Sequence, residues 1–420
     1  MPFQSLPWVN KTNIYEVNVR QYTAEGTFNA FAKHLLRLKE MGVETLWFMP
    51  IHPIGKIKRL GTLGSYYSIS DHKAINPEFG TMGDFKALVN KAHQMGFKII
   101  IDWVANHTAW DHVWTTTHPE FYIKNESGNF VSPYDWEDVI QIDHKNAAEQ
   151  EAMIDCMQFW ITECDIDGFR CDMAHLTPLD FWKRARMLLD AIKPIFWLAE
   201  TEHPEYHEVF DASYTWEFLH TMEKYGQGKT NMDGLEEVLL KYEKKFPTNA
   251  IRMFFTSNHD ENSHSGSEYE RMREAAIPFA IFCATWDGIP LIYSGQELPV
   301  TKRLSFFNKD EIHWANDIKL QKFYKTLLDL HSTHPALEAI ATKPKRINTN
   351  NDEAVFAFLR KKDAYEVLVI LNLSSSEQDF EIDDDRVGGS YKNIFTGENI
   401  ELSSNRKLFM KNWDHLVLVR

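Results

Sequence analysis

Short apolar runs alternate with stretches of helical periodicity along the first three quarters of the chain. Residues 43–48 and 97–104 are apolar enough to be strands with both faces buried. Between them, residues 85–95 place Leu88, Val89 and Ala92 on one side of a helix that ends at Gly96. Since a strand without a polar face must be covered on both sides, the alternation predicts a parallel sheet with helices on both faces.

Eight segments of the chain have the pattern of such strands. They lie at 13–20, 43–48, 97–104, 168–172, 194–199, 210–214, 252–257 and 290–293. Helices are predicted at 28–41, 85–95, 147–164, 179–192, 235–245, 275–284 and 319–331. Parallel strands of this number, joined by helices, close into a barrel more readily than they form an open sheet. The predicted fold class is therefore α/β, with a (β/α)8 TIM barrel as the main unit.

Two parts of the chain do not follow this alternation. Residues 107–143, after the third predicted strand, are rich in Trp, Tyr, Thr and His and poor in aliphatic residues, which is typical of a functional insertion. After residue 335, short strands follow one another without helices, at 354–359, 366–373, 380–382, 400–402 and 416–419. We therefore expect a barrel formed by 1–106 and 144–335, a short inserted domain at 107–143, and a C-terminal all-β sandwich domain at 336–420.

Charge and cysteine usage narrow the classes of function. The net charge is −15, which argues against nucleic acid and against an anionic membrane surface as partners, because both need a basic patch. None of the apolar segments reaches the length of a transmembrane helix. The four cysteines have no Cys-x-x-Cys spacing and lie in apolar stretches. We therefore expect reduced thiols and a cytoplasmic protein.

Aromatic residues are frequent, at 13% of the chain with 13 Trp and 15 Tyr. Flat apolar rings with polar edges stack on the faces of sugars, so the excess points toward carbohydrate, whereas core packing is the commoner use of such rings. Both interpretations stay open for Trp110, Trp114, Tyr134 and Trp136 in the insertion.

Polar residues follow several predicted strands directly, at the positions where a barrel of this kind builds its active site. The third strand contains Asp102, the fifth ends in Glu200, and Asp260 follows the seventh. On the fourth strand, Arg170 and Asp172 share one face because side chains alternate, and the guanidinium favours the ionised carboxylate. One such pair is explained equally well by a structural ion pair. Acids at successive strand ends around one rim indicate a catalytic site, and paired carboxylates are the groups that glycoside hydrolysis uses.

The same strand ends carry motifs that resemble glycoside hydrolase family 13, the α-amylase family. The matching stretches lie at 102–107, 168–172, 198–200 and 257–260, with supporting matches at 42–50 and 288–297. All of them occur in the family's order, and the resemblance extends from about residue 13 to the C-terminus. It implies that 107–143 is the family's small B domain and that the residues after about 335 form its C-terminal β-sandwich.

The resemblance also implies roles for individual residues. Asp172 would be the nucleophile, Glu200 the general acid and later the base, and Asp260 the residue that binds sugar hydroxyls and stabilises the transition state. The residues expected to bind or position the substrate are Tyr67, Asp102, His107, Arg170, His175 and His259. Within this set, Arg170 would orient Asp172 with support from Asp102.

The chain departs from the family's pattern after the nucleophile. Many α-amylases have Lys-His three and four residues after it, where this chain has His175 and Leu176. The resemblance therefore does not carry over to the contacts with the leaving sugar. Asn106 matches a residue that binds calcium in many members, and an Asn at a strand end is equally typical of a loop cap. The expected chemistry requires no cofactor. Calcium, at Asn106, is the metal that the resemblance suggests.

The leading hypothesis is a retaining α-glycoside hydrolase that cleaves α-1,4-glucosidic bonds of maltooligosaccharides or starch fragments through a covalent glycosyl-enzyme. The alternative is a transferase or isomerase on the same scaffold, similar to trehalose synthases or 4-α-glucanotransferases. A non-catalytic carbohydrate-binding or partner protein is disfavoured because all three acids of the family are present. The expected partner is an α-glucan oligosaccharide, with neither nucleic acid nor a membrane. For a retaining enzyme, the carboxyl groups of Asp172 and Glu200 should lie about 5–5.5 Å apart.

Overall fold

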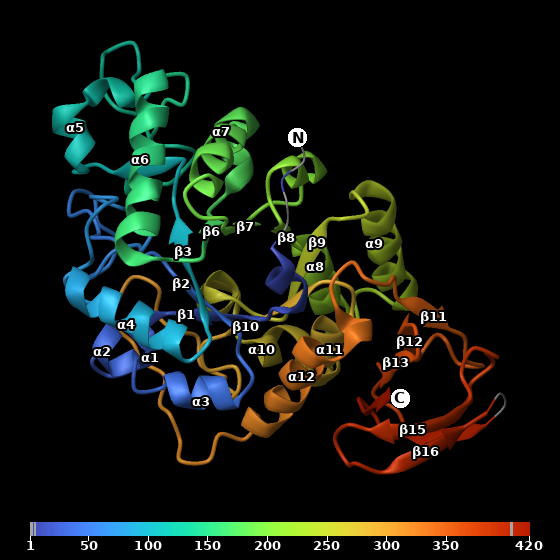
Figure 1. Cartoon of the computed structure of the whole chain (residues 1–420). Helices are drawn as coiled ribbons and strands as arrows, with labels where there is room; N and C mark the ends of the chain where they lie inside the picture. Colours follow the sequence, from blue (N-terminus) through green and yellow to red (C-terminus); the bar gives the residue numbers. More distant parts are fainter. Residues whose placement is uncertain (1–2, 4–5, 404–405) are drawn as a thin grey trace.

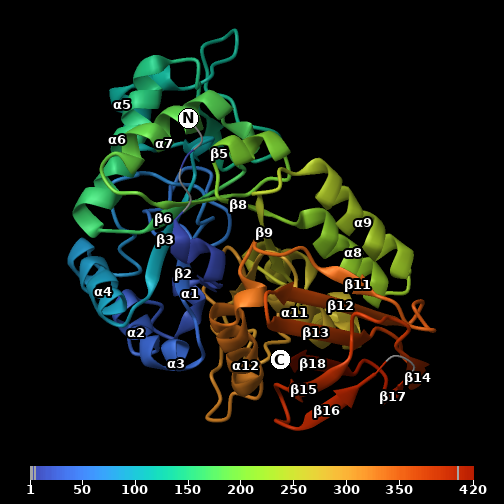
Figure 2. The same cartoon turned by 45° about the vertical axis from the view of Figure 1, so that its right-hand side comes forward.

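The computed structural model describes residue 3, residues 6–403 and residues 406–420, and its main unit is a closed barrel (Figure 1, Figure 2). The barrel strands are β1 (Ile14–Val17), β2 (Thr45–Phe48), β3 (Lys98–Trp103), β6 (Gly168–Cys171), β7 (Phe196–Ala199), β8 (Ala212–Tyr214), β9 (Ile251–Phe255) and β10 (Ile289–Tyr293). Around the ring they follow the order β1, β10, β9, β8, β7, β6, β3, β2, and neighbouring strands are parallel. The predicted (β/α)8 barrel is confirmed.

The strands form where the apolar runs predicted them because both of their faces are buried, as in β2, β7 and β10. The helices outside them are α4 (Met82–Gln94), α6 (Ala147–Cys164), α7 (Leu179–Asp190), α8 (Trp216–Gly226), α9 (Met232–Lys245), α11 (Ala276–Thr285) and α12 (Gln321–Thr333). Thr81 and Asp84 form a capping box that begins α4. Asn146 begins α6 by accepting hydrogen bonds from its first backbone amides, so it fixes the point at which the insertion returns to the barrel.

The first strand is shorter than predicted. It was expected at 13–20, but β1 ends at Val17. The side chain of Asn18 accepts a hydrogen bond from the amide of Gln21 and so begins a helical turn, α1 (Val19–Tyr22). The cap at Asn18 therefore ends the strand, although the alternation of polar and apolar residues continues to residue 20.

The helix expected at 28–41 is divided into α2 (Phe28–Phe31) and α3 (Leu35–Glu40). Between them, the amides of Lys33 and His34 donate to carbonyls three residues back, so the chain tightens into a turn. Helix α8 was not predicted. In the described ranges, no helix combines the length and the apolar character that crossing a bilayer requires.

The segment between β3 and α6 has little regular structure. Its elements are β4 (His107–Ala109), α5 (Val113–Thr117), the 3-10 turn η2 (Pro119–Phe121) and β5 (Val139–Gln141). Strands β4 and β5 pair antiparallel, so the segment returns close to the point where it leaves the barrel. Figure 1 shows α5 beyond the barrel, next to α6. Trp114 stacks on His72 and meets Phe121 edge-on, so this ring belongs to the core beneath the segment.

The last part of the chain forms two antiparallel sheets. The larger contains β11 (Lys345–Ile347), β12 (Val355–Lys362), β13 (Tyr365–Asn372), β18 (His415–Val419), β15 (Gly389–Asn393) and β16 (Asn399–Leu402), and the smaller pairs β14 (Gln378–Glu381) with β17 (Lys407–Met410). A buried cluster that includes Leu368, Ile370, Phe380 and Met410 draws on both sheets. The predicted C-terminal all-β unit is confirmed. Strands β11 and β15 were not predicted because most of their residues are polar or glycine, and β17, of four residues, was not predicted either.

The larger C-terminal sheet lies beside α11 of the barrel (Figure 2), and aromatic side chains join the two. Phe282 of α11 and Trp286, which follows it, lie against Phe356 and Phe358 of β12. Rings of this size bury much apolar area, so the contact ties the larger sheet to the outside of the barrel.

We expect the thiols to be inert in the folded protein, because Cys156, Cys164, Cys171 and Cys283 are all free and buried. Burial raises the pKa of Cys171 well above its ordinary value, which keeps this thiol protonated. Dithiothreitol should leave activity unchanged, and Ellman's reagent should react slowly until denaturation exposes the four thiols. Loss of activity in dithiothreitol would show that a disulfide matters.

Candidate active site

The carboxyl ends of the barrel strands surround a cavity of about 430 Å³. It is lined by Asp172, Glu200, Asp260, Tyr67 and His107, by residues 135–139 of the insertion, and by Leu60, Phe306 and Phe307. The structure therefore brings the three acids singled out in the sequence together at one cavity. Its volume lies within the range of about 300–1,000 Å³ that is usual for small-molecule sites.

A single buried guanidinium connects carboxyl groups from three strands. Nη1 of Arg170 donates to Oδ1 of Asp172 at 3.0 Å and to Oδ1 of Asp102 at 2.9 Å. Nη2 forms an ion pair with Oε2 of Glu200 at 2.9 Å, and Nε donates to the hydroxyl of Tyr214 at 3.1 Å. Arg170 and Asp172 share one face of β6, as the alternation along the strand predicted. Arg170 thus fixes these carboxyl groups relative to one another.

Burial and this shared cation act in opposite directions on the pKa values of Asp172 and Glu200, the two cavity-lining carboxyl groups that Arg170 contacts. Burial raises the pKa of Glu200 to about 7, although Arg170 lowers it. Burial also raises the pKa of Asp172, again against Arg170. The sequence predicted that Arg170 would favour ionised Asp172, and Arg170 does lower the pKa of Asp172. Because Arg170 also contacts Asp102, the effect of burial on this pKa is the larger of the two. Two neighbouring carboxyl groups with raised pKa values hold a proton between them near neutral pH, as an acid and a base side by side require.

His259 is a second cation at the site. Its Nδ1 lies 2.5 Å from Oε1 of Glu16, and its Nε2 lies 3.2 Å from Oδ2 of Asp260 and 2.7 Å from the hydroxyl of Tyr67. Burial disfavours the imidazolium, but the carboxylates of Asp260 and Glu16 outweigh it and raise the pKa of His259 well above its ordinary value. Burial likewise disfavours ionised Asp260, yet the charge of His259 lowers the pKa of Asp260. Asp260 is therefore ionised.

Tyr67 and His107 both line the cavity. The hydroxyl of Tyr67 donates to Oδ2 of Asp102 at 3.0 Å, and Trp47 donates to the same oxygen at 3.2 Å. Asp102 is fully buried beneath the cavity and contacts Arg170 and Tyr67 instead of lining the space. Burial lowers the pKa of His107 to about 3, so this imidazole is neutral and can accept or donate one hydrogen bond.

Asn106 has the contacts of a loop cap. Its Oδ1 accepts a hydrogen bond from Nε2 of Gln141 at 2.9 Å, and its backbone carbonyl accepts one from the amide of Ile142 at 3.2 Å. Both contacts tie the start of the insertion to its end. Among the described residues there is also no group of three or more His, Cys, Asp or Glu that could hold a metal ion. The described contacts use the oxygens of Asn106 within the chain, and calcium at Asn106 stays a prediction from the resemblance.

His175 lies on the side of the site that carries Glu200, outside the cavity lining. Its ring stacks on that of His203, with centroids 5.2 Å apart and planes 13° apart. The two histidines follow β6 and β7, respectively. The position next to His175, where many α-amylases have His, is occupied here by Leu176 in a 3-10 turn.

The aromatic residues of the insertion divide between the two roles that the sequence left open. Trp136 lines the cavity, with Tyr134 beside it at 5.2 Å between centroids. Tyr134 is 70% exposed, so it is available at the rim. Trp110 is covered by the ammonium of Lys58, 3.6 Å from its ring centre, and does not line the cavity.

Several residues of the site were not predicted from the sequence. Glu16 and Tyr214 lie at the carboxyl ends of β1 and β8, so the rule that found Glu200 and Asp260 would also have found these two. Leu60 lies in an irregular loop, where no periodicity marks a residue that lines a cavity. The same holds for Phe306 and Phe307, which only the folded structure brings to the site.

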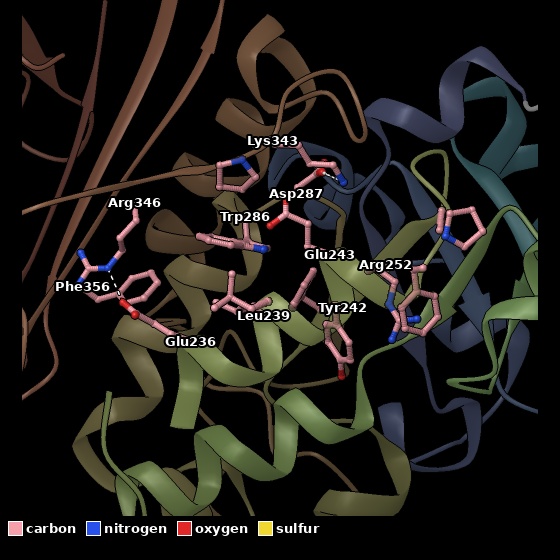
Figure 3. A pocket seen from close by; sticks show the side chains of 16 residues that line it. Glu236, Leu239, Tyr242, Glu243, Arg252, Trp286, Asp287, Lys343, Arg346 and Phe356 are labelled. Carbon is pink, nitrogen blue, oxygen red and sulfur yellow. Dashed lines mark hydrogen bonds and ion pairs between the residues drawn. The ribbon is translucent and has the colours of Figure 1, made fainter. Parts of the chain in front are cut away.

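A second cavity, of about 270 Å³, lies near the amino end of β9, between α9 and the C-terminal sheets (Figure 3). Figure 3 shows that two of its basic side chains pair with acids: Arg346 with Glu236 at 2.7 Å and Lys343 with Asp287 at 3.4 Å. Because these charges neutralise one another across the boundary, this cavity belongs to the joint between the barrel and the C-terminal sheets.

Comparison with known proteins places these features in one family. The model of the alpha amylase catalytic domain matches residues 10–354, and that of the alpha amylase C-terminal all-beta domain matches residues 347–416. The noncanonic maltogenic alpha-amylase AmyB from Thermotoga neapolitana has a similar structure, with a TM-score of 0.91, 30% identity, and coverage of 98% of this chain and 99% of that one.

Two curated relatives are longer than this chain. Alpha-amylase MalA of Haloarcula japonica is 26% identical over 89% of this chain and 57% of its own length. The alpha-1,4-glucan:maltose-1-phosphate maltosyltransferase of Corynebacterium pseudotuberculosis is 25% identical over 83% of this chain and 56% of its own length. The chain thus spans a little more than half the length of these two relatives.

The contacts of His259 lead to a prediction for its titration. In the unaltered protein the imidazole should stay protonated through neutral pH, because two carboxylates flank it. Glu16→Gln removes one of them, so the pKa of His259 should fall and its titration should move to lower pH in NMR spectra of labelled histidine. As a matched control, Glu149→Gln removes the carboxylate 2.9 Å from His144 and should leave His259 unchanged. An unaltered His259 titration in Glu16→Gln would contradict this account.

Proposed function

The chain belongs to the alpha-amylase family, and on this basis we propose that it is a retaining α-glycoside hydrolase acting on α-1,4-linked glucose oligomers or starch fragments. One observation carries the proposal: Asp172 and Glu200 line one cavity and contact neighbouring nitrogens of one guanidinium, that of Arg170. Carboxyl groups held by one guanidinium lie close together. This favours the short spacing of retaining enzymes over the wider spacing that admits a water molecule between the acids.

In the first step of the proposed reaction, Asp172 attacks the anomeric carbon while Glu200 donates its proton to the glycosidic oxygen. The bond between the sugar and its leaving group breaks, and an ester forms between the sugar and Asp172. Arg170 holds Oδ1 of Asp172, so Oδ2 is the oxygen available for attack. The raised pKa of Glu200 keeps a proton available for the leaving group near neutral pH.

In the second step, Glu200 acts as a base. Having lost its proton, it takes one from a water molecule, whose oxygen attacks the anomeric carbon and releases Asp172. The backbone amide of Met173 donates to Oε2 of Glu200 at 2.8 Å, and Arg170 contacts the same oxygen. This leaves Oε1 as the oxygen that exchanges the proton. Two displacements restore the α configuration of the product.

The other residues of the lining act on the sugar that is being cleaved. Asp260 is ionised beside His259 and would stabilise the positive charge that develops on the sugar. Tyr67 offers a ring face, and His107 offers a neutral imidazole to a hydroxyl group. We further propose that residues 107–143 act as an inserted domain, since residues 135–139 supply part of the cavity wall.

A glycosyl transferase is the second candidate. The relative from Corynebacterium pseudotuberculosis is named a maltosyltransferase, and a transferase would use the same intermediate with a sugar in place of water. The described contacts of Asp172 and Glu200 serve both reactions equally. For location, the four free and buried cysteines support a reducing compartment, and we propose the cytoplasm.

Product analysis with maltoheptaose tests the proposed function. Hydrolysis with retention should release α-anomers first, visible in NMR spectra recorded before mutarotation, and every cleavage should add a reducing end. Products longer than the substrate, with no rise in reducing ends, would instead establish a transferase. Initial release of β-anomers would overturn the assignment of Asp172 as nucleophile.

Glu200→Gln tests the role of this residue as the acid. The variant keeps the shape of the side chain and removes its proton, so turnover of maltooligosaccharides should fall by on the order of 10²–10⁴. α-Maltosyl fluoride needs no protonated leaving group, so this variant should still give a burst of fluoride. Azide, which needs no base, should then accelerate the second step.

Asp172→Asn is the matched control, and it should abolish both reactions because no ester can form. If Glu200→Gln were as inactive on the fluoride as Asp172→Asn, Glu200 would not be the general acid.

A further inference from the structure

One wall of the active-site cavity is built by two loops that lie far apart in the sequence. One loop follows β2 and the other follows β10. Their side chains Leu60, Phe306 and Phe307 line the cavity, and we refer to these three residues as the wall. All three are apolar, and none takes part in the reaction described above.

The two loops are joined directly. The amide of Leu63 donates to the carbonyl of Phe307 at 3.0 Å, and both the amide and the hydroxyl of Thr62 donate to Oδ1 of Asn308, at 3.0 and 2.9 Å. Gly61 has a φ of +61°, and a Cβ atom there would lie 2.6 Å from Cβ of Phe307. The loops therefore meet without a gap at Gly61.

A buried arginine fixes the joint from below. Nη1 of Arg20 donates to the carbonyl of Gly64 at 3.1 Å and to that of Phe306 at 3.4 Å, and Nη2 donates to that of Leu63 at 3.4 Å. Arg20 thus binds carbonyls of both loops at once, and its side chain is buried. A buried cation held by several acceptors is a fixed part of the fold, so the wall is preformed.

The wall lies opposite Glu200. Glu200 directly follows strand β7, which is four places from β1 around the ring, and the two loops follow β2 and β10, the neighbours of β1. The ring of Phe306 is parallel to that of Tyr67, with planes 9° apart and centroids 6.3 Å apart, so the wall adjoins the ring that would hold the sugar. The side of Glu200 carries the stacked pair of His175 and His203.

This placement determines which end of the substrate meets the wall. Glu200 protonates the oxygen of the leaving sugar, so the leaving sugar lies toward β7. The sugar that becomes attached to Asp172 then lies toward β1 and the wall. In an α-1,4-linked chain, the sugars beyond the attached one continue toward the non-reducing end.

We propose that the wall stops the chain at this end, so that the enzyme binds an α-glucan by its non-reducing terminus and releases pieces of one short length. This inference rests on the proposed function. It adds the direction in which the substrate binds and the way in which the enzyme cleaves it, from one end of the chain. It assigns Leu60, Phe306 and Phe307 to substrate specificity.

A pair of substrates tests the inference with the unaltered protein. Maltoheptaose labelled with 2-aminobenzamide at its reducing end should be cleaved, and its first products should be shorter by one fixed length. The same compound with a 4,6-O-benzylidene group on its non-reducing sugar should clash with the wall, and kcat/KM should fall by about tenfold or more. Equal kcat/KM for the two compounds, or first products of mixed length, would overturn the inference and leave the proposed function standing. Cleavage of neither compound would overturn both.

Variants of the wall identify the residues responsible. Leu60→Ala combined with Phe307→Ala shortens the wall but keeps the joint, whose hydrogen bond at residue 307 uses the backbone carbonyl. The ratio of kcat/KM for the blocked compound to that for the free compound should rise toward one. As a control, Leu36→Ala changes a leucine that is 61% exposed on α3 and should leave this ratio unchanged. A folded double variant that discriminates as strongly as the unaltered protein would overturn the assignment of these side chains.

Discussion

The positive charge of Arg170 is the constraint on which the rest of the site depends. A guanidinium without solvent contact is costly unless acceptors surround it. Here Asp102, Asp172 and Glu200 supply carboxyl groups, and Tyr214 supplies a hydroxyl, from four different barrel strands. The same contacts that satisfy Arg170 therefore set the distances between the reacting groups. Stability and geometry of the site have one common cause, and removing the charge would leave several buried acids without a partner.

The carboxyl groups of the site outnumber its cations. Arg170 and His259 are the cations that face five carboxyl groups, those of Glu16, Asp102, Asp172, Glu200 and Asp260. His259 serves Asp260 and Glu16, and Arg170 is divided among the others. Because His259 lies beside Asp260 whereas Arg170 is shared by three acids, Asp260 is ionised and Glu200 retains a proton near neutral pH. Different environments in one cavity thus keep a proton on Glu200 for the leaving group and a negative charge on Asp260 for the developing positive charge of the sugar.

Much of this site was predictable because it sits at the ends of apolar strands. Asp172 and Glu200 follow such strands directly, Asp260 lies in the loop after β9, and Glu16 would have been found by the same rule. The wall could not be predicted in this way. Thr62 and Asn308 are 246 residues apart, and nothing in either loop indicates that the other is its partner. Strands β11, β15 and β17 were missed for a related reason, since their pairing is decided by neighbours and not by their own composition.

The joint between the two loops has a consequence for how the protein is made. The acids Asp172 and Glu200 are synthesised long before Phe307, and β10 must dock beside β1 before the loop that follows it can reach its partner. Contacts of such long range form late, because the entropy of closing a long loop must be overcome first. A nascent chain would thus possess its reactive groups before it possesses the boundary that selects among substrates. Selectivity among substrates would therefore be the last property to form during folding, when β10 pairs with β1 and closes the barrel.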